Sequence, residues 1–134
     1  MNTPTLLAAG TAALVVACAS SSSPLKPTRE SRISDLSEAA CDKYGDTSSG
    51  CPGYGTAAAQ RYQTTADCKR DFANAVGTLW PADQCGEGRI SADRYASCEA
   101  RVESYSCPTG AARFIESVSA LDGCQPSKVC IDAR

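Results

Sequence analysis

The chain has 134 residues, which is enough for one domain but not comfortably for two. Thirteen Lys and Arg residues nearly balance fifteen Asp and Glu residues, so the formal net charge is −2 and nucleic acid is not expected as a partner. The sequence contains no histidine, which removes the usual general base at neutral pH and the commonest metal ligand. Nine cysteines accompany only one Met, two Phe and one Trp, so cross-links are expected to supplement a thin core.

An apolar run at 6–17 ends directly before Cys18. At about 1.5 Å per residue, this run is too short for a helix to cross a hydrocarbon core of about 30 Å, so 1–17 is predicted to be a signal peptide. The sequence VVAC at 15–18 resembles the bacterial lipobox, and this resemblance implies cleavage before Cys18 and lipidation of its thiol. The alternative is a plain secretory signal with a chance cysteine near the cleavage point. Ala19, where an aspartate would favour inner-membrane retention, suggests the outer membrane of the cell envelope.

The segment after the predicted cleavage point is rich in serine and proline and has no apolar period. Residues 18–32 are therefore predicted to form the lipidated cysteine and a flexible tether, with a root-mean-square span of about 20 Å. The remaining residues, 33–134, are predicted to form a single disulfide-rich domain.

Eight cysteines remain after the one assigned to lipid. An even number in an exported chain predicts four disulfides, although the sequence does not specify their pairing. Zinc sites usually contain close C-x₂₋₄-C pairs, and the tightest spacing here has five intervening residues, so no metal is expected. The predicted disulfide cysteines are Cys41, Cys51, Cys68, Cys85, Cys98, Cys107, Cys124 and Cys130.

Apolar residues recur at helical spacing in four segments, with no alternating run long enough for a strand. The first helix spans 33–44 before Gly45, and the second runs from a capping-box-like start at Thr64 to Pro81. The third spans 91–105, with Ser91 as its N-cap, and the fourth spans 114–121 before Gly123. The expected fold is therefore a small, mostly α, disulfide-stapled bundle of about four helices with little or no β structure.

Three of the cysteines fall on the apolar stripes of their predicted helices: Cys41, Cys68 and Cys98. Burial of these stripes would bring their sulfur atoms together, which favours bridges between helices. The other five lie near helix ends or in loops, where they could pin Gly- and Pro-rich connections.

The chain also resembles small cysteine-rich lipoproteins of myxobacteria, some of which are labelled natural-product-biosynthesis lipoproteins. The resemblance rests on CDKY at 41–44, WPADQC at 80–85 followed by GRI at 88–90, and KVC at 128–130, together with the spacing of the cysteines. In this comparison both Cys98 and Cys107 belong to the third helix. The resemblance implies lipid anchoring and a disulfide framework, and it supplies no catalytic residues.

The sequence offers little catalytic equipment. Carboxylate pairs such as Asp42 with Asp46, or Asp93 with Glu99, are interpreted as parts of solvated helix faces. There is no G-x-S-x-G elbow, no dinucleotide or P-loop glycine pattern and no closely spaced dithiol. We therefore expect no cofactor and no enzymatic activity.

Large aromatic and Arg residues supply candidates for a contact surface, because such residues dominate binding hot spots. Tyr54 lies among glycines and is the first choice for an exposed contact, and Trp80, Arg89 and Tyr62 could join it. For Trp80 the alternative to a contact role is a structural one, in which it plugs the end of a helix in a thin core.

These observations favour a non-catalytic, lipid-anchored envelope module that binds a protein, an envelope polymer or a small molecule. One alternative is an inhibitor of secreted hydrolases, in which a bridge-constrained loop at 49–56 enters a protease cleft. A weaker alternative is an accessory enzyme in natural-product biosynthesis that uses carboxylates alone.

Overall fold

The computed structural model describes residues 27–107, 114–119 and 121–133. These ranges contain six α-helices, two 3-10 helices and no strand; one isolated antiparallel bridge joins Ile90 to Cys130. The mostly helical, disulfide-rich fold is confirmed. The helices are α1 (Arg29–Gly45), α2 (Thr65–Leu79), α3 (Ala82–Cys85), α4 (Ala92–Ser104), α5 (Phe114–Ser119) and α6 (Pro126–Val129), with η1 (Thr47–Ser49) and η2 (Asp122–Cys124) between them.

Helix α1 begins four residues earlier than the sequence predicts. Thr28 is its N-cap, and the Thr28 hydroxyl accepts a hydrogen bond from the Ser31 amide at 3.1 Å. The Arg29 side chain, 15% exposed, reaches the end of α2, where Nε and Nη2 each donate at 2.7 Å to the carbonyls of Trp80 and Gly77. These contacts place residues 29–32, which the composition assigned to the tether, within α1.

Helix α2 follows the prediction closely. The Asp67 amide donates to the Thr64 hydroxyl at 3.2 Å, and that hydroxyl donates to the Asp67 carboxylate at 2.8 Å. The helix ends at Leu79, because the residue before Pro81 is disfavoured in helical conformation.

Helix α4 forms where predicted, but two details differ. Ser91 occupies the N-cap position without making a side-chain capping hydrogen bond. The helix ends at Ser104, so Cys107 lies beyond it and not within it. Tyr105 directly follows α4 and has an extended backbone. It leads the chain toward Cys51, the disulfide partner of Cys107.

The last predicted helix is shorter than expected. Helix α5 ends at Ser119, and Gly123 lies within the 3-10 turn η2. The short helices α3 and α6 were not predicted, because four residues are too few to show a helical period. The Cys85–Cys130 disulfide connects these two short elements.

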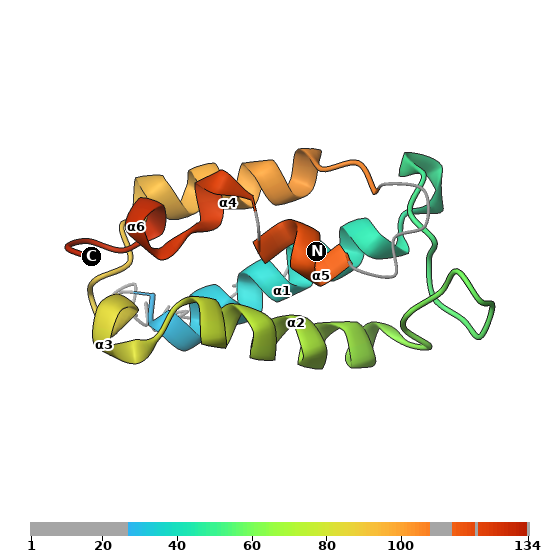
Figure 1. The fold of residues 1–134 in the computed structure, drawn as a ribbon, viewed down its shortest axis with the longest axis horizontal. Helices are drawn as coiled ribbons and strands as arrows, with labels where there is room; N and C mark the ends of the chain where they lie inside the picture. Colours follow the sequence, from blue (N-terminus) through green and yellow to red (C-terminus); the bar gives the residue numbers. More distant parts are fainter. Residues whose placement is uncertain (1–26, 108–113, 120, 134) are drawn as a thin grey trace, which may run out of the picture.

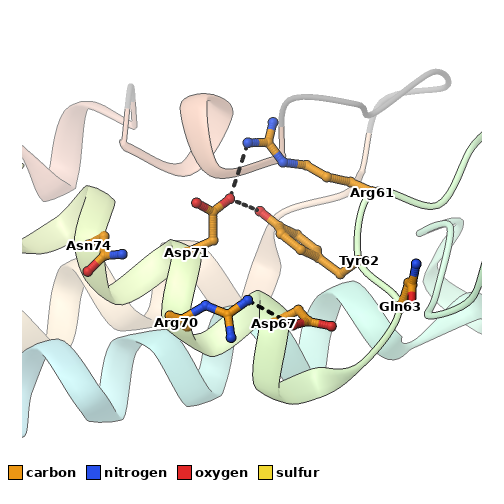
Figure 2. A pocket seen from close by; sticks show the side chains of 7 residues that line it. All are labelled: Arg61, Tyr62, Gln63, Asp67, Arg70, Asp71 and Asn74. Atoms are coloured by element: carbon orange, nitrogen blue, oxygen red, sulfur yellow. Dashed lines mark hydrogen bonds and ion pairs between the residues drawn. The ribbon is translucent and has the colours of Figure 1, made fainter.

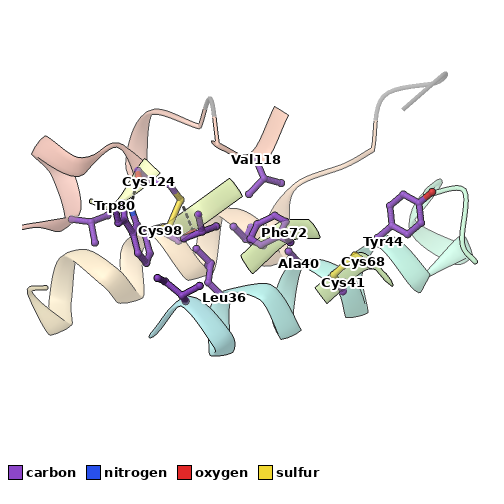
Figure 3. Close-up of a cluster of buried hydrophobic side chains, with 14 of the residues drawn as sticks. Leu36, Ala40, Cys41, Tyr44, Cys68, Phe72, Trp80, Cys98, Val118 and Cys124 are labelled. Carbon is purple, nitrogen blue, oxygen red and sulfur yellow. Dashed lines mark hydrogen bonds between the residues drawn. A yellow bond between two sulfur atoms is a disulfide. The ribbon is translucent and has the colours of Figure 1, made fainter. Parts of the chain in front are cut away.

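The three long helices lie alongside one another, with α5 against α2 and the short C-terminal elements against α4 (Figure 1). Helix α2 runs back along α1. The core between them contains large, fully buried side chains and buried cysteines (Figure 3). Its largest members are Trp80, Tyr44, Tyr95, Phe72 and Leu36.

Each disulfide holds together two parts of the molecule that are distant in sequence. Cys41–Cys68 joins α1 to α2, which confirms a bridge between helical stripes. Cys98–Cys124 joins α4 to η2, so Cys98 does not pair with another of the long helices. Cys51–Cys107 joins the loop after α1 to the segment after α4. All eight predicted disulfide cysteines are paired.

None of the helices within the described ranges is both long and apolar enough to span a membrane. The signal peptide, Cys18 and most of the predicted tether lie outside those ranges.

Candidate functional site

Trp80 belongs to the core and is not part of a contact surface. Its side chain is fully buried, its indole Nε1 donates to the Cys124 carbonyl at 2.9 Å, and its ring meets that of Tyr95 edge-on at 6.2 Å. The prediction of a surface contact was wrong, and the interpretation as a plug at the end of α2 is correct. In a core with few large apolar residues, Trp80 is buried because its large side chain removes the most apolar area from water.

Tyr54 is also used mainly to build the fold. Its hydroxyl donates to the Cys41 carbonyl in α1, and its ring packs 5.5 Å from that of Tyr44, which leaves Tyr54 half-buried. Tyr62 is 4% exposed and contacts the other side of this cluster, with its ring centroid 5.1 Å from that of Tyr44. Arg89 is exposed, but it lies before α4 and donates to the Asp83 carbonyl at 2.8 Å. The predicted contact residues therefore do not form one surface.

The loop that was expected to enter a protease cleft is folded against the body of the protein. Gly53 has a positive φ of 69°, and a Cβ at that position would lie 2.8 Å from a Thr47 methyl group, so glycine is needed there. The tip closes as a tight turn in which the Gln60 amide donates to the Ala57 carbonyl at 2.8 Å. The Gln60 side chain donates to the Tyr54 carbonyl at 3.0 Å and accepts from the Ala57 amide at 3.0 Å. The tip of the loop is therefore compact and closed by its own hydrogen bonds.

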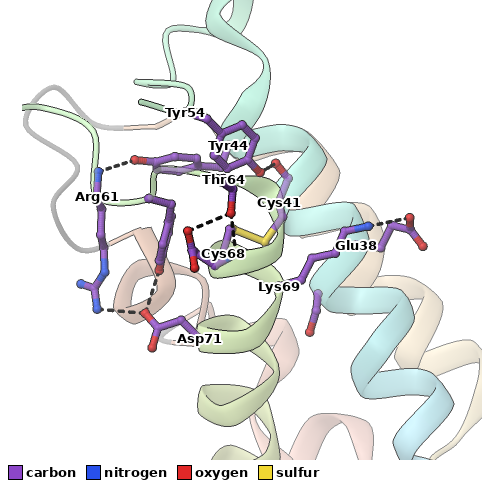
Figure 4. The surroundings of a disulfide bond; sticks show 12 residues. Glu38, Cys41, Tyr44, Tyr54, Arg61, Thr64, Cys68, Lys69 and Asp71 are labelled. Carbon is purple, nitrogen blue, oxygen red and sulfur yellow. Dashed lines mark hydrogen bonds and ion pairs between the residues drawn. A yellow bond between two sulfur atoms is a disulfide. The ribbon is translucent and has the colours of Figure 1, made fainter. Parts of the chain in front are cut away.

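At its base, this loop is held beside the first turns of α2. The Arg61 amide donates to the Tyr44 hydroxyl at 2.8 Å (Figure 4). The Gly55 amide donates to the Tyr62 carbonyl at 3.0 Å. The Cys41–Cys68 disulfide lies next to these contacts and fixes α2 against α1. The backbone at 61–63 is thereby placed opposite the exposed face of α2.

The two segments form an open groove with a volume of about 480 Å³ (Figure 2). The loop contributes three of its lining residues and α2 contributes four, at helical spacings of three, four and seven residues that place them on one face. All of the lining side chains are polar except for the ring of Tyr62. The lining residues are Arg61, Tyr62, Gln63, Asp67, Arg70, Asp71 and Asn74.

Two ion pairs line the groove. Arg61 Nη2 lies 3.1 Å from Asp71 Oδ2, which also accepts a hydrogen bond from the Tyr62 hydroxyl at 3.0 Å. Arg70 Nη2 lies 2.8 Å from Asp67 Oδ1. The groove thus contains two cations and two anions, and its formal charge is zero.

Two residues that line the groove, Asp67 and Tyr62, are kept in fixed protonation states by their surroundings. Hydrogen bonds from the Thr64 hydroxyl and from Arg70 hold the pKa of Asp67 below its usual range. Burial, followed by the hydrogen bond to Asp71, raises the pKa of Tyr62 well above its usual range. At neutral pH Asp67 is ionised and Tyr62 is neutral, so these groups are suited to hydrogen bonding and ion pairing, not to proton transfer.

The carboxylates considered at 42 and 46 line another, smaller depression of about 290 Å³ together with Glu103. The pKa of Asp46 is lowered, chiefly by a hydrogen bond from the Ser48 hydroxyl, so this group does not have the raised pKa of a general acid. Within the part of the chain that the structure describes, no group of three or more His, Cys, Asp or Glu residues is arranged to hold a metal ion.

Apart from Tyr62, the groove was missed by the sequence analysis. A signal was present, because Asp67, Arg70, Asp71 and Asn74 form a polar stripe on a predicted helix. Such a stripe is typical of any solvated helix face. What distinguishes this one is the loop at 61–63, which returns to face it only in the folded protein.

The fold and the groove define a class of protein: a small helical domain, stapled by four disulfides, with a polar and charge-balanced groove on one helix. Within that class, the chain belongs to a family of unknown function, DUF6184, whose model matches residues 37–132. The match includes all eight paired cysteines and every residue that lines the groove. No curated protein and no solved structure gave a significant match to the chain.

Proposed function

We propose that this chain is a non-catalytic binding module of the bacterial cell envelope, anchored by lipid at Cys18, and that it binds an envelope component in the polar groove. The observation that carries the proposal is the groove itself, in which two ion pairs and two amide side chains face an open depression. Exposed planar polar groups provide donors and acceptors for a polar ligand.

The surrounding structure supports binding because it holds the groove in one shape. Cys68 is adjacent in sequence to Asp67, and its disulfide to Cys41 fixes this part of α2 against α1. The Cys51–Cys107 disulfide ties down the loop that supplies the opposite wall. A site that is already ordered loses little conformational entropy when a ligand binds.

The position of the groove suits a tethered protein. The predicted tether leads into the N-terminal end of α1, whereas the groove lies beside the first turns of α2, which pack near the C-terminal end of α1 (Figure 1). Seventeen residues of helix span about 25 Å, so the groove is displaced from the attachment point by most of the length of the domain. This arrangement leaves the groove accessible when the chain is held at a membrane.

The anchor is a separate part of the proposal. It is supported by the lipobox-like VVAC at 15–18 and by the four disulfides, which are typical of proteins outside the cytosol. Intact mass of the exported chain, with and without reduction, tests it: we expect cleavage before Cys18, added acyl mass and a gain of two hydrogens per disulfide on reduction. An unmodified Cys18 in the exported chain would exclude the lipid anchor.

Site-specific photo-cross-linking tests the binding function directly. A photoreactive residue replaces Asn74 in the groove of the full chain, and the same residue replaces the exposed Glu87 in a control. In cells that export the chain, we expect a discrete adduct from position 74 and none from position 87. No adduct from either position, or equal adducts from both, would contradict binding in the groove.

A further inference from the structure

The two ion pairs of the groove are arranged as two neighbouring charge couples. Asp67 and Asp71 are four residues apart on α2, so their side chains emerge about 6 Å apart on one face. Each carboxylate has its own guanidinium partner, Arg70 on the helix and Arg61 on the loop (Figure 2). A ligand in the groove therefore meets positive and negative groups alternately over about one helical turn.

This arrangement discriminates among ligands by charge. A ligand with a single net charge is attracted by only one member of each ion pair, and it competes with the other member for that contact. The displaced member, which has the same sign of charge as the ligand, then remains nearby without its partner. A ligand with one ammonium and one carboxylate group can contact both kinds of partner, so that every charge keeps an opposite neighbour. The alternation of charges therefore favours a net-neutral, zwitterionic ligand over a purely cationic or anionic one.

The dimensions of the groove suggest how far apart those ligand charges are. An extended peptide advances about 3.3–3.6 Å per residue, so the ammonium and carboxylate groups of an unblocked dipeptide are about 7 Å apart. That separation is close to the distance between the two charge couples. Gln63 and Asn74, which also line the groove, carry amides that can donate to and accept from a peptide bond.

The lining is less suited to a sugar ring. Tyr62 is the only aromatic residue among those that line the groove, and it is 4% exposed, so it offers no open face for stacking. Polar side chains without an exposed ring match the hydrogen-bonding groups of a peptide better than the apolar face of a sugar.

We infer that the groove binds the end of a short peptide that carries both a free ammonium and a free carboxylate group, of the kind that a dipeptide zwitterion presents. This inference rests on the proposed function, because it names the ligand class of the same site. The ammonium group is assigned to the Asp carboxylate of one charge couple, and the carboxylate group to the Arg guanidinium of the other couple.

Nuclear magnetic resonance titration of the full, disulfide-bonded chain in detergent tests the inference. The probes are alanyl-alanine, its N-acetylated form, its C-terminal amide and the doubly blocked form. We expect alanyl-alanine to shift the side-chain amide signals of Gln63 and Asn74, and each single block to weaken binding by about fivefold, as expected for loss of one exposed ion pair.

Two charge-neutral double variants provide the comparison. Asp67→Asn with Arg70→Gln removes one ion pair of the groove and should weaken alanyl-alanine binding. Glu38→Gln with Lys69→Gln removes a pair with a similar separation, 2.8 Å, on the side of α2 that faces α1, and should leave binding unchanged (Figure 4).

Equal binding of the doubly blocked probe, tighter binding of a singly blocked probe, or no shift with any probe would each overturn the inference. These results leave the cross-link from position 74 as an independent measure of the proposed function. An adduct there without dipeptide binding would mean that the groove is a binding site for a different ligand class.

Discussion

Arg29 provides a direct test of how the start of α1 is held. Its guanidinium donates to the carbonyls of Gly77 and Trp80, at the end of α2, where the last carbonyls of a helix lack partners within the helix. Arg29→Met keeps most of the aliphatic stem and removes both donors. Hydrogen bonds from a charged group contribute about 1.5–3 kcal/mol each, and water can rehydrate part of the exposed carbonyls, so we expect a net loss of about 2–3 kcal/mol.

The measurement is urea unfolding of the disulfide-bonded chain, followed by fluorescence of Trp80, which is the single tryptophan and is fully buried. The midpoint should fall without a change in slope. Arg29→Lys should lose part of this free energy, because an ammonium group cannot reproduce the two directed contacts of a guanidinium. Glu30→Gln is the control, since Glu30 pairs with Arg29 at an exposed position and should leave the midpoint unchanged. An unchanged midpoint in Arg29→Met would refute the assignment of these contacts as a stabilising cap.

Three further predictions concern the loop and its anchors. Replacing Cys51 and Cys107 together by Ala removes a disulfide that spans 56 residues. In the chain-entropy account this should lower the free energy of unfolding by about 4 kcal/mol, while the helical circular dichroism is retained. A double variant as stable as the original protein would contradict this prediction. Tyr54→Phe removes the hydrogen bond to the Cys41 carbonyl and should cost about 1 kcal/mol in the same urea assay, whereas a gain in stability would argue against that bond. The pKa of Tyr62 is raised in the folded state, whereas a tyrosine in the unfolded chain ionises at about pH 10. The resulting contribution to the free energy of unfolding is therefore complete below about pH 10 and is lost as the pH rises from there toward the folded pKa. Tyr62→Phe should flatten the decline of stability above pH 10, and an identical alkaline decline in both proteins would contradict the raised pKa.

The helices of this protein could be predicted from local sequence signals because the interactions that start and end them are local. Thr64 and Asp67 are three residues apart and form the predicted cap. The start of α1 could not be predicted, because Arg29 contacts carbonyls 48 and 51 residues away. Ser91 occupies the N-cap position that the local sequence predicts, but its side chain makes no capping hydrogen bond.

The groove depends on long-range packing more than the helices do. The charged residues of α2 form a stripe that is evident in the sequence, but the groove exists only because the loop at 61–63 returns to the helix. Trp80 is a similar case: a residue type common at binding surfaces is buried here, as its interpretation as a plug expected, because the core has few other large side chains.

Composition and short-range periodicity are enough to predict that the domain is helical and that eight cysteines are available for pairing. The folded structure was needed to show that Cys41 pairs with Cys68 and Cys98 with Cys124, and that Arg61 of the loop meets Asp71 of α2 across the groove, beside the local Asp67–Arg70 pair. The physical reason is range: a helical turn is stabilised by residues three or four positions apart, whereas a disulfide or a groove requires distant segments to pack before their side chains can meet.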